Sequence, residues 1–123
     1  MSAKSVIQKL MVKPGSRLLL LNVPAGHAGQ LGEVPAGVTV ASTLAGPADV
    51  ILSFVTSRQE LVEQLAALKA ALASGGRLWI AYPKGRAELH RDIIREVARG
   101  AGLEGVAIFA IDDTWAALRL KEA

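Results

Sequence analysis

A glycine-rich loop that follows a run of aliphatic residues could bind an anion. Residues 17–22 are a buried-type strand, and Asn22, Gly26, His27 and Gly29 come directly after or within the loop. Glycines let a ligand approach the backbone closely, and a helix N-terminus at such a place favours negative charge. His27 could accept or donate a proton near neutral pH. The alternative is that the glycines only shape a tight loop and that His27 is an exposed loop residue.

Four further side chains that could contact a ligand stand at the ends of later predicted strands. Thr56 and Ser57 follow one strand, and Tyr82 and Lys84 close the next. Open α/β sheets bind ligands in the crevice at the carboxyl ends of their strands. Ser57 has an alternative role as a helix cap, and Lys84 could equally be an exposed turn lysine. The candidate ligand-binding crevice therefore comprises Asn22, Gly26, His27, Gly29, Thr56, Ser57, Tyr82 and Lys84.

Several kinds of chemistry are excluded by residue type. The chain has no cysteine and two histidines, so disulfides, thiolate zinc sites, cysteine nucleophiles and multi-histidine cages are ruled out. Asp112 and Asp113 are adjacent in a turn, where their carboxylates diverge, and no third ligand accompanies them. No Gly-x-Ser-x-Gly elbow surrounds Ser53. We therefore predict no metal site, assign no catalytic residue and favour a protein that is not an enzyme.

Length, charge and composition limit the number of domains and the kinds of partner that this chain can have. The 123 residues, 51% of them hydrophobic, are enough for one domain with a buried core. The 14 basic and 11 acidic residues give a net charge of +3, and aromatic residues make up 4%. Few stacking aromatics argue against a nucleic-acid partner. The longest early aliphatic run, 18–21, is far shorter than the roughly 20 residues of a membrane span. No targeting segment is visible, so we expect a soluble, cytoplasmic protein without membrane contact.

Alternating helix and strand patterns predict the fold. The expected strands are 17–22, 38–41, 49–55, 77–82, 106–111 and 115–120, and the expected helices are 4–11, 57–74 and 86–99. Ser57 and Glu60 form a capping box, Gly75 and Gly76 end that helix, and the short turn 112–114 forces the last two strands to pair antiparallel. The pattern predicts one α/β domain over 1–123. Its sheet is doubly wound in three layers and mostly parallel, with an antiparallel C-terminal hairpin.

Trp115 opens the last predicted strand. Alternation places Ala117 and Arg119 on its face of the sheet, while Ala116, Leu118 and Leu120 take the other face. A large ring beside small alanines can cover the sheet, and we expect Trp115 to lie next to the helix 86–99.

Two resemblances cover most of the chain. Residues 49–121 resemble the second half of a class I methyltransferase. The resemblance rests on a strand that opens at Asp49, a strand that starts with Gly75-Gly76-Arg77-Leu78, and a final hairpin. That resemblance implies the strand order 2-1-3-4-6-5. Nearly the whole chain is similar to a bacterial family of small proteins known only as a domain of unknown function. The shared motifs are Lys13-Pro14-Gly15, Asn22-Val23-Pro24-Ala25-Gly26, Tyr82-Pro83-Lys84 and Trp115-Ala116-Ala117-Leu118-Arg119.

The methyltransferase resemblance implies S-adenosylmethionine as cofactor, but the residues disfavour it. The loop glycines are three apart, Pro24 lacks an N–H, and the second strand ends in Ala41-Ser42-Thr43 where an acid should hold the ribose. No cofactor is predicted. The leading hypothesis is a degenerate methyltransferase-like domain that acts in binding or assembly without methyl transfer. One alternative is an enzyme that binds a small anionic ligand or nucleotide in the crevice. The other is a nucleic-acid accessory protein, suggested by the basic N-terminal part.

Self-association is also expected. By the same resemblance the chain lacks one strand and one covering helix of a full methyltransferase. The strand 38–41 then becomes an exposed sheet edge that a second copy could cover. We therefore predict a homodimer.

Overall fold

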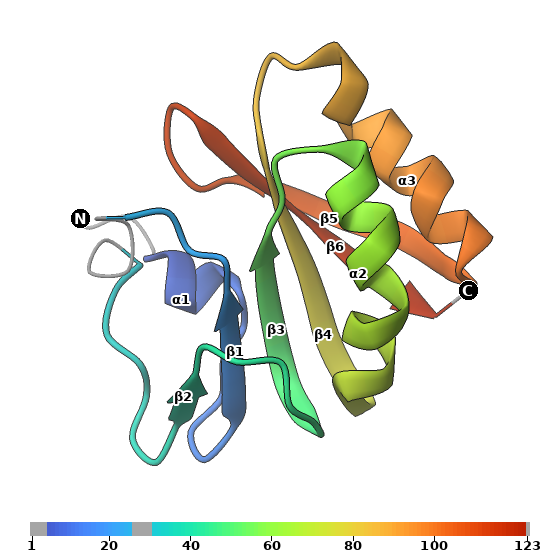
Figure 1. Cartoon of the computed structure of the whole chain (residues 1–123). Coiled ribbons are helices and arrows are strands. Elements are labelled where there is room, and N and C mark those ends of the chain that lie inside the picture. Colours follow the sequence, from blue (N-terminus) through green and yellow to red (C-terminus); the bar gives the residue numbers. More distant parts are fainter. Residues whose placement is uncertain (1–4, 26–30, 123) are drawn as a thin grey trace.

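A computed structural model gives the structure of the chain, and it describes residues 5–25 and 31–122. Six strands form one sheet in the order β2-β1-β3-β4-β6-β5 (Figure 1). Strands β1 to β4 pair in parallel, and β6 pairs antiparallel with both β4 and β5. The predicted fold class and strand order are thus confirmed. The strands are β1 Arg17–Leu21, β2 Thr39–Ala41, β3 Ala48–Phe54, β4 Leu72–Pro83, β5 Leu103–Ala110 and β6 Trp115–Glu122.

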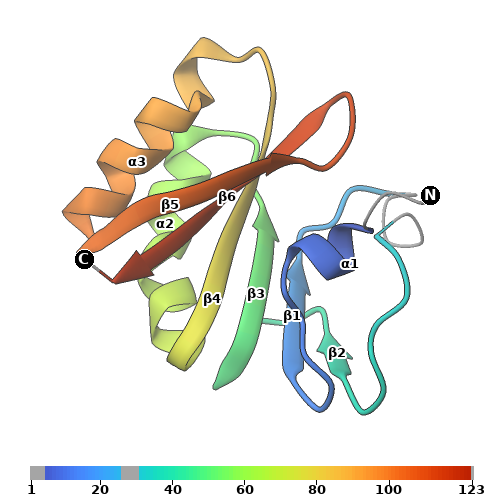
Figure 2. The same ribbon diagram turned by 180° about the vertical axis from the view of Figure 1, so that it is seen from behind.

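The helices cover the two faces of the sheet unequally. Helices α2 (Arg58–Ala71) and α3 (Arg91–Gly100) lie on one face, and the four-residue α1 (Val6–Lys9) lies on the other, as Figures 1 and 2 show from opposite sides. A 3-10 turn, η2 (Ala87–Leu89), precedes α3. The face under α1 is completed by aromatic side chains, because one helical turn is too small to bury a six-stranded sheet.

The central strands are apolar on both sides, as a doubly covered sheet requires. Alternate residues of each strand enter two separate cores. Leu19, Ile51 and Leu78 pack against α2 and α3, while Leu18 and Leu52 pack on the α1 side. This two-sided burial explains why the strands appear in the sequence as continuous aliphatic runs.

The start of α2 agrees with the predicted cap, and its end does not. The Ser57 hydroxyl accepts a hydrogen bond from the Glu60 N–H at 3.1 Å, while the Glu60 carboxylate accepts from the Thr56 N–H and not from Ser57. The predicted end at Gly75 and Gly76 was wrong, since α2 ends at Ala71. Strand β4 begins at once, and the glycines form an irregular turn within it.

The predicted helix 86–99 is two elements. His90 has extended backbone and separates η2 from α3, and its Nδ1 accepts a hydrogen bond from the Asp92 N–H at 3.3 Å. His90 is therefore the N-cap of α3. The helical spacing of Leu89, Ile93 and Val97 predicts that these three residues form the buried stripe. Leu89 is buried, but in α3 the fully buried residues are Ile94 and Ala98, and Ile93 and Val97 are half-buried.

Trp115 lies on the face opposite α3, so its predicted place beside that helix was wrong. Ala117 shares its core, and Ala116, Leu118 and Leu120 enter the other core, which confirms the alternation. The Trp115 ring meets Phe54 edge-on with centroids 5.1 Å apart. Trp79 makes a similar contact with Phe109 at 5.0 Å and donates its Nε1–H to the Leu10 carbonyl at 3.3 Å. These rings supply the second covering layer that α1 cannot complete.

Strand β2 forms one edge of the sheet, as predicted. Only residues 42–47 connect it to β3 on the far side of β1. This connection packs on the end of α2, where a Cβ at Gly46 would stand 2.6 Å from the Ala71 carbonyl oxygen. Val40 of β2 is 46% exposed.

Candidate functional site

A small polar cluster joins the carboxyl ends of β1 and β3 to α2. Asn22 follows β1 with a positive φ of 58°, which asparagine tolerates better than most residues. Its Nδ2 donates to Gln64 Oε1 at 3.5 Å, and the Ser53 hydroxyl donates to the same oxygen at 3.2 Å. Ser53 is fully buried. The amide of Gln64 thus holds Asn22 and Ser53 to the helix, a role that the sequence pattern did not predict.

A hollow of about 480 Å³ lies beside this cluster, where β1 and β2 end. Among the described residues, its polar side chains are Asn22 and Ser42, and none of the side chains that line it is charged. The ribose-binding position of dinucleotide folds needs a carboxylate that accepts hydrogen bonds from the sugar hydroxyls. None of the described residues that line the hollow carries such a carboxylate; they are Leu20, Asn22, Val23, Val40, Ala41 and Ser42.

Thr56 and Ser57 take part in backbone contacts at the start of α2. The Thr56 N–H donates to Glu60 Oε1 at 3.1 Å, and its carbonyl accepts from Arg86 at 3.1 Å. Ser57 caps the helix. Arg86 was not among the candidate residues, and its contact ties the turn after β4 to the turn after β3.

Tyr82 and Lys84 end β4 in different environments. Tyr82 is buried in the core beneath α2 and α3, and this burial raises the pKa of its phenol, while Arg91 and Arg95 act to lower it. Lys84 Nζ donates to the Asp112 carbonyl at 2.7 Å, and the Lys84 N–H donates to the Thr114 carbonyl at 2.8 Å. The side chain of Lys84 therefore fastens the turn between β5 and β6.

The candidate crevice is thus divided in the structure. Asn22 lines the hollow at the ends of β1 and β2, and Thr56, Ser57, Tyr82 and Lys84 do not line it. Gly26, His27 and Gly29 lie outside the described residues, so their part in a site stays a prediction. Within residues 5–25 and 31–122, no group of three or more metal-binding side chains occurs.

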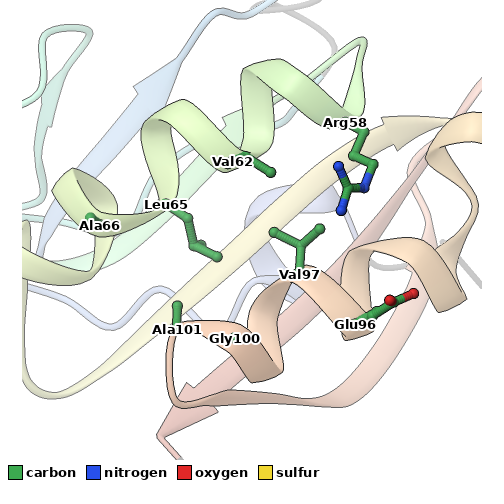
Figure 3. Close-up of a pocket in the computed structure, with 8 residues that line it drawn as sticks. All are labelled: Arg58, Val62, Leu65, Ala66, Glu96, Val97, Gly100 and Ala101. Atoms are coloured by element: carbon green, nitrogen blue, oxygen red, sulfur yellow. The ribbon is translucent and has the colours of Figure 1, made fainter.

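A second hollow, which the sequence analysis did not identify, runs between α2 and α3. It measures about 390 Å³, and Figure 3 shows Arg58 and Glu96 at one end and Ala66, Gly100 and Ala101 toward the other. Val62 is 49% exposed beside it. Small and aliphatic side chains give this groove an apolar floor, so its chemistry suits a hydrophobic contact more than catalysis.

The sheet order and the antiparallel end define a methyltransferase-like α/β fold. Solved structures with this fold include an S-adenosylmethionine-dependent methyltransferase from Aquifex aeolicus, with TM-score 0.65, 16% identity and coverage of 96% of this chain and 88% of that one. The ribosomal protein L11 methylase of Lactobacillus delbrueckii subsp. bulgaricus has TM-score 0.64 and 15% identity, covering 94% and 74%. A TehB-like methyltransferase from Corynebacterium glutamicum has TM-score 0.62 and 17% identity, covering 95% and 85%.

The sequence narrows this class to one family. Residues 20–123 match the family described as "Protein of unknown function (DUF3052)", and the chain belongs to that family. No curated protein matches it in sequence. In the part of the chain that the structure describes, no helix is long and apolar enough to cross a membrane.

Proposed function

We propose that this protein is a degenerate methyltransferase-like domain that acts in binding or assembly and does not transfer methyl groups. The observation that carries the proposal is that no described residue lining the hollow where β1 and β2 end has a charged side chain. The structural neighbours include proteins described as dependent on S-adenosylmethionine, which makes that molecule the ligand to test.

The residues present do not fit that cofactor. Strand β2 ends at Ala41 and is followed by Ser42, so a carboxylate for the ribose hydroxyls is missing there. The Asn22 amide is already hydrogen-bonded to Gln64, and Pro24 has no N–H to offer. We therefore derive no chemical step through S-adenosylmethionine.

Calorimetry with S-adenosylmethionine and S-adenosylhomocysteine tests this part of the proposal. We expect no saturable heat, which corresponds to a Kd weaker than about 1 mM. The contrary result would be micromolar binding that Ser42→Trp abolishes by filling the hollow. Ala66→Trp, which adds the same ring to the exposed side of α2, is the matched control and should leave any binding unchanged.

Assembly is proposed to take the form of a homodimer through the β2 edge. Within the part of the chain that the structure describes, no strand pairs with β2 on the side away from β1, and an exposed edge strand readily pairs with another strand. Three aliphatic side chains in and around it are more than one-third exposed: Val34, Val40 and Leu44. A two-fold axis at β2 would bring this apolar surface against its copy in a second chain.

Light scattering of wild type and edge variants tests the dimer. We expect a dimer at high micromolar concentration that Val40→Lys converts to monomer, because a lysine on an edge strand opposes pairing. Val106→Lys is the matched control, since Val106 is similarly exposed on the opposite edge strand, β5, and should leave the dimer intact. A monomeric wild type at that concentration would remove self-assembly from the proposal.

The cytoplasmic location stays a prediction. So does the use of the predicted crevice by an anionic ligand, since three of its residues lie outside the described part of the chain.

A further inference from the structure

Positive charge gathers at the amino edge of the parallel strands, the end opposite the candidate crevice. A hollow of about 540 Å³ lies between the start of β4 and the end of β6, and Lys69, Arg119 and Lys121 line it with one carboxylate, Glu122. This volume falls within the roughly 300–1,000 Å³ of small-molecule sites. The hollow therefore has both the size and the charge for an anionic ligand.

A smaller hollow on the other side of the same β4 turn continues the basic surface. It measures about 160 Å³, and Lys13, Arg77 and Asp49 line it. The Asp49 carboxylate already accepts a hydrogen bond from the Arg17 N–H at 2.8 Å. Among the described residues, the two hollows together present five basic side chains and two acidic ones, so basic side chains outnumber acidic ones on both sides of the turn.

Two of these arginines have a buried N–H that lacks an acceptor. The Nε atoms of Arg77 and Arg119 are inaccessible to solvent and make no hydrogen bond to any described residue. Arg119 stands opposite Trp79 across the β4–β6 pair, and Arg77 precedes Trp79 by two residues, so both side chains leave the same face of the sheet. Because both Nε atoms are buried, a ligand in either hollow would contact the terminal Nη atoms of these guanidinium groups and not Nε.

The turn between the hollows offers backbone and hydroxyl donors. Ser74, Gly75 and Gly76 line both hollows. Gly75 has φ +77° and open space where a side chain would stand, so a ligand can approach its backbone. Lys69 Nζ donates to the Ala101 carbonyl at 2.7 Å, which fixes its position without neutralising its charge.

We propose that this amino-edge hollow binds the phosphate group of a ligand through Arg119, Lys121 and the Ser74–Gly76 turn. Guanidinium groups match the oxygens of phosphate in paired hydrogen bonds, and lysine adds a point charge. The phosphate could belong to a small phosphorylated molecule or to a nucleic-acid backbone. The inference concerns the edge opposite the hollow at β1 and β2, so it stands or fails independently of the proposed function.

Amide NMR titrations with pyrophosphate, and separately with a single-stranded RNA of about twelve nucleotides, test the site in the full chain. We expect saturable shifts of the Ser74, Gly75 and Gly76 amides. The double variant Arg119→Gln/Lys121→Gln should raise Kd by roughly tenfold or more, because it removes two charge-assisted contacts. Arg91→Gln/Arg99→Gln makes the same change in net charge on the exposed surface of α3 and should change Kd by less than about twofold.

The possible results distinguish a nucleic-acid ligand, a small phosphorylated ligand and the absence of a phosphate site. RNA that binds more tightly than pyrophosphate and weakens steeply with added salt identifies nucleic-acid phosphates. Pyrophosphate binding at least as tight as RNA identifies a small phosphorylated ligand. Absence of saturable shifts at the turn, or equal weakening by both double variants, overturns the proposal. If Arg119→Gln/Lys121→Gln loses the native NMR spectrum, the Kd values of two single variants are compared instead. These are Lys121→Gln at the site and Arg99→Gln as the control, and both change an exposed side chain.

Discussion

Trp115→Ala should lower the free energy of unfolding by about 3–5 kcal/mol, the range for truncating a large buried aromatic side chain. Trp115 is 8% exposed, and its ring packs edge-on against Phe54 on the face that α1 leaves largely uncovered. Truncating Trp115 removes part of the aromatic layer that covers this face of the sheet, and neither α2 nor α3 lies on this face to fill the space. A domain of this size should then melt about 10–20 °C lower.

Thermal and urea unfolding of Trp115→Ala measure this effect. Val62→Ala is the matched control, because Val62 is 49% exposed and its truncation should change stability by less than about 0.5 kcal/mol. A melting temperature for Trp115→Ala within a degree or two of wild type (measured side by side) would show that the ring is not part of the core. Trp115 would then become a candidate for ligand stacking.

Gly46→Ala should cost about 3 kcal/mol or more, at the upper end of overpacking effects. A Cβ there would stand 2.6 Å from the Ala71 carbonyl oxygen and 2.7 Å from the Ala71 Cα. Both atoms are backbone at the end of α2, so no side chain can rotate away. Either the connection 42–47 or the last turn of α2 must move.

Urea unfolding of Gly46→Ala and Gly100→Ala compares the same added methyl group in two settings. Gly100 ends α3, with no neighbour within 4 Å of the added Cβ and no positive φ. Alanine there should stabilise the protein by about 0.5–1 kcal/mol, because glycine loses more conformational freedom in a helix. Equal effects of the two changes would contradict the close packing of the connection on α2.

Sequence patterning predicted the elements of this fold well where burial decides the structure. Continuous aliphatic runs such as 18–21 are typical of central strands that are covered on both faces, and the three-residue turn 112–114 requires antiparallel pairing of the strands that it joins. The strand order came from the resemblance to methyltransferases, and the sheet confirms it.

Local signals failed where tertiary contacts compete with them. Gly75 and Gly76 have the character of a helix end, yet strand pairing between Ala48 and Leu72 stops α2 at Ala71. Alternation predicted which residues share the face of Trp115, but it cannot say which face a helix will cover. That choice depends on the crossover connections, which no single strand encodes.

The candidate site was the least predictable part. The carboxyl ends of the strands were located correctly, but two residues that make contacts there were not predicted. Gln64 lies within α2 and Arg86 in the turn after β4, and no sequence motif marks either residue as functional. The basic amino edge draws on α2, β4 and β6, which meet only in three dimensions. Charge counted along the chain therefore could not reveal it.

The connection between β2 and β3 has a contour length that limits the architecture. Its six residues would span only about 9 Å as a helix. Ala41 pairs with Leu19, and Ala48 lies two residues before Val50, the partner of Leu18. The connection must therefore cross two strand spacings and also return by about three residues along the strand direction. The straight-line distance that it covers is roughly 14 Å. Seven Cα steps separate Ala41 from Ala48, and they could reach about 23 Å if fully extended. The connection therefore spans the path without being fully extended, but it is too short to form a helix throughout and cover β1. Each residue added to the carboxyl end of β2 lengthens the return path by about 3 Å and shortens the connection by one residue. Strand β2 could therefore gain only about one residue before a longer connection is needed, so the length of the connection limits how far this edge of the sheet extends.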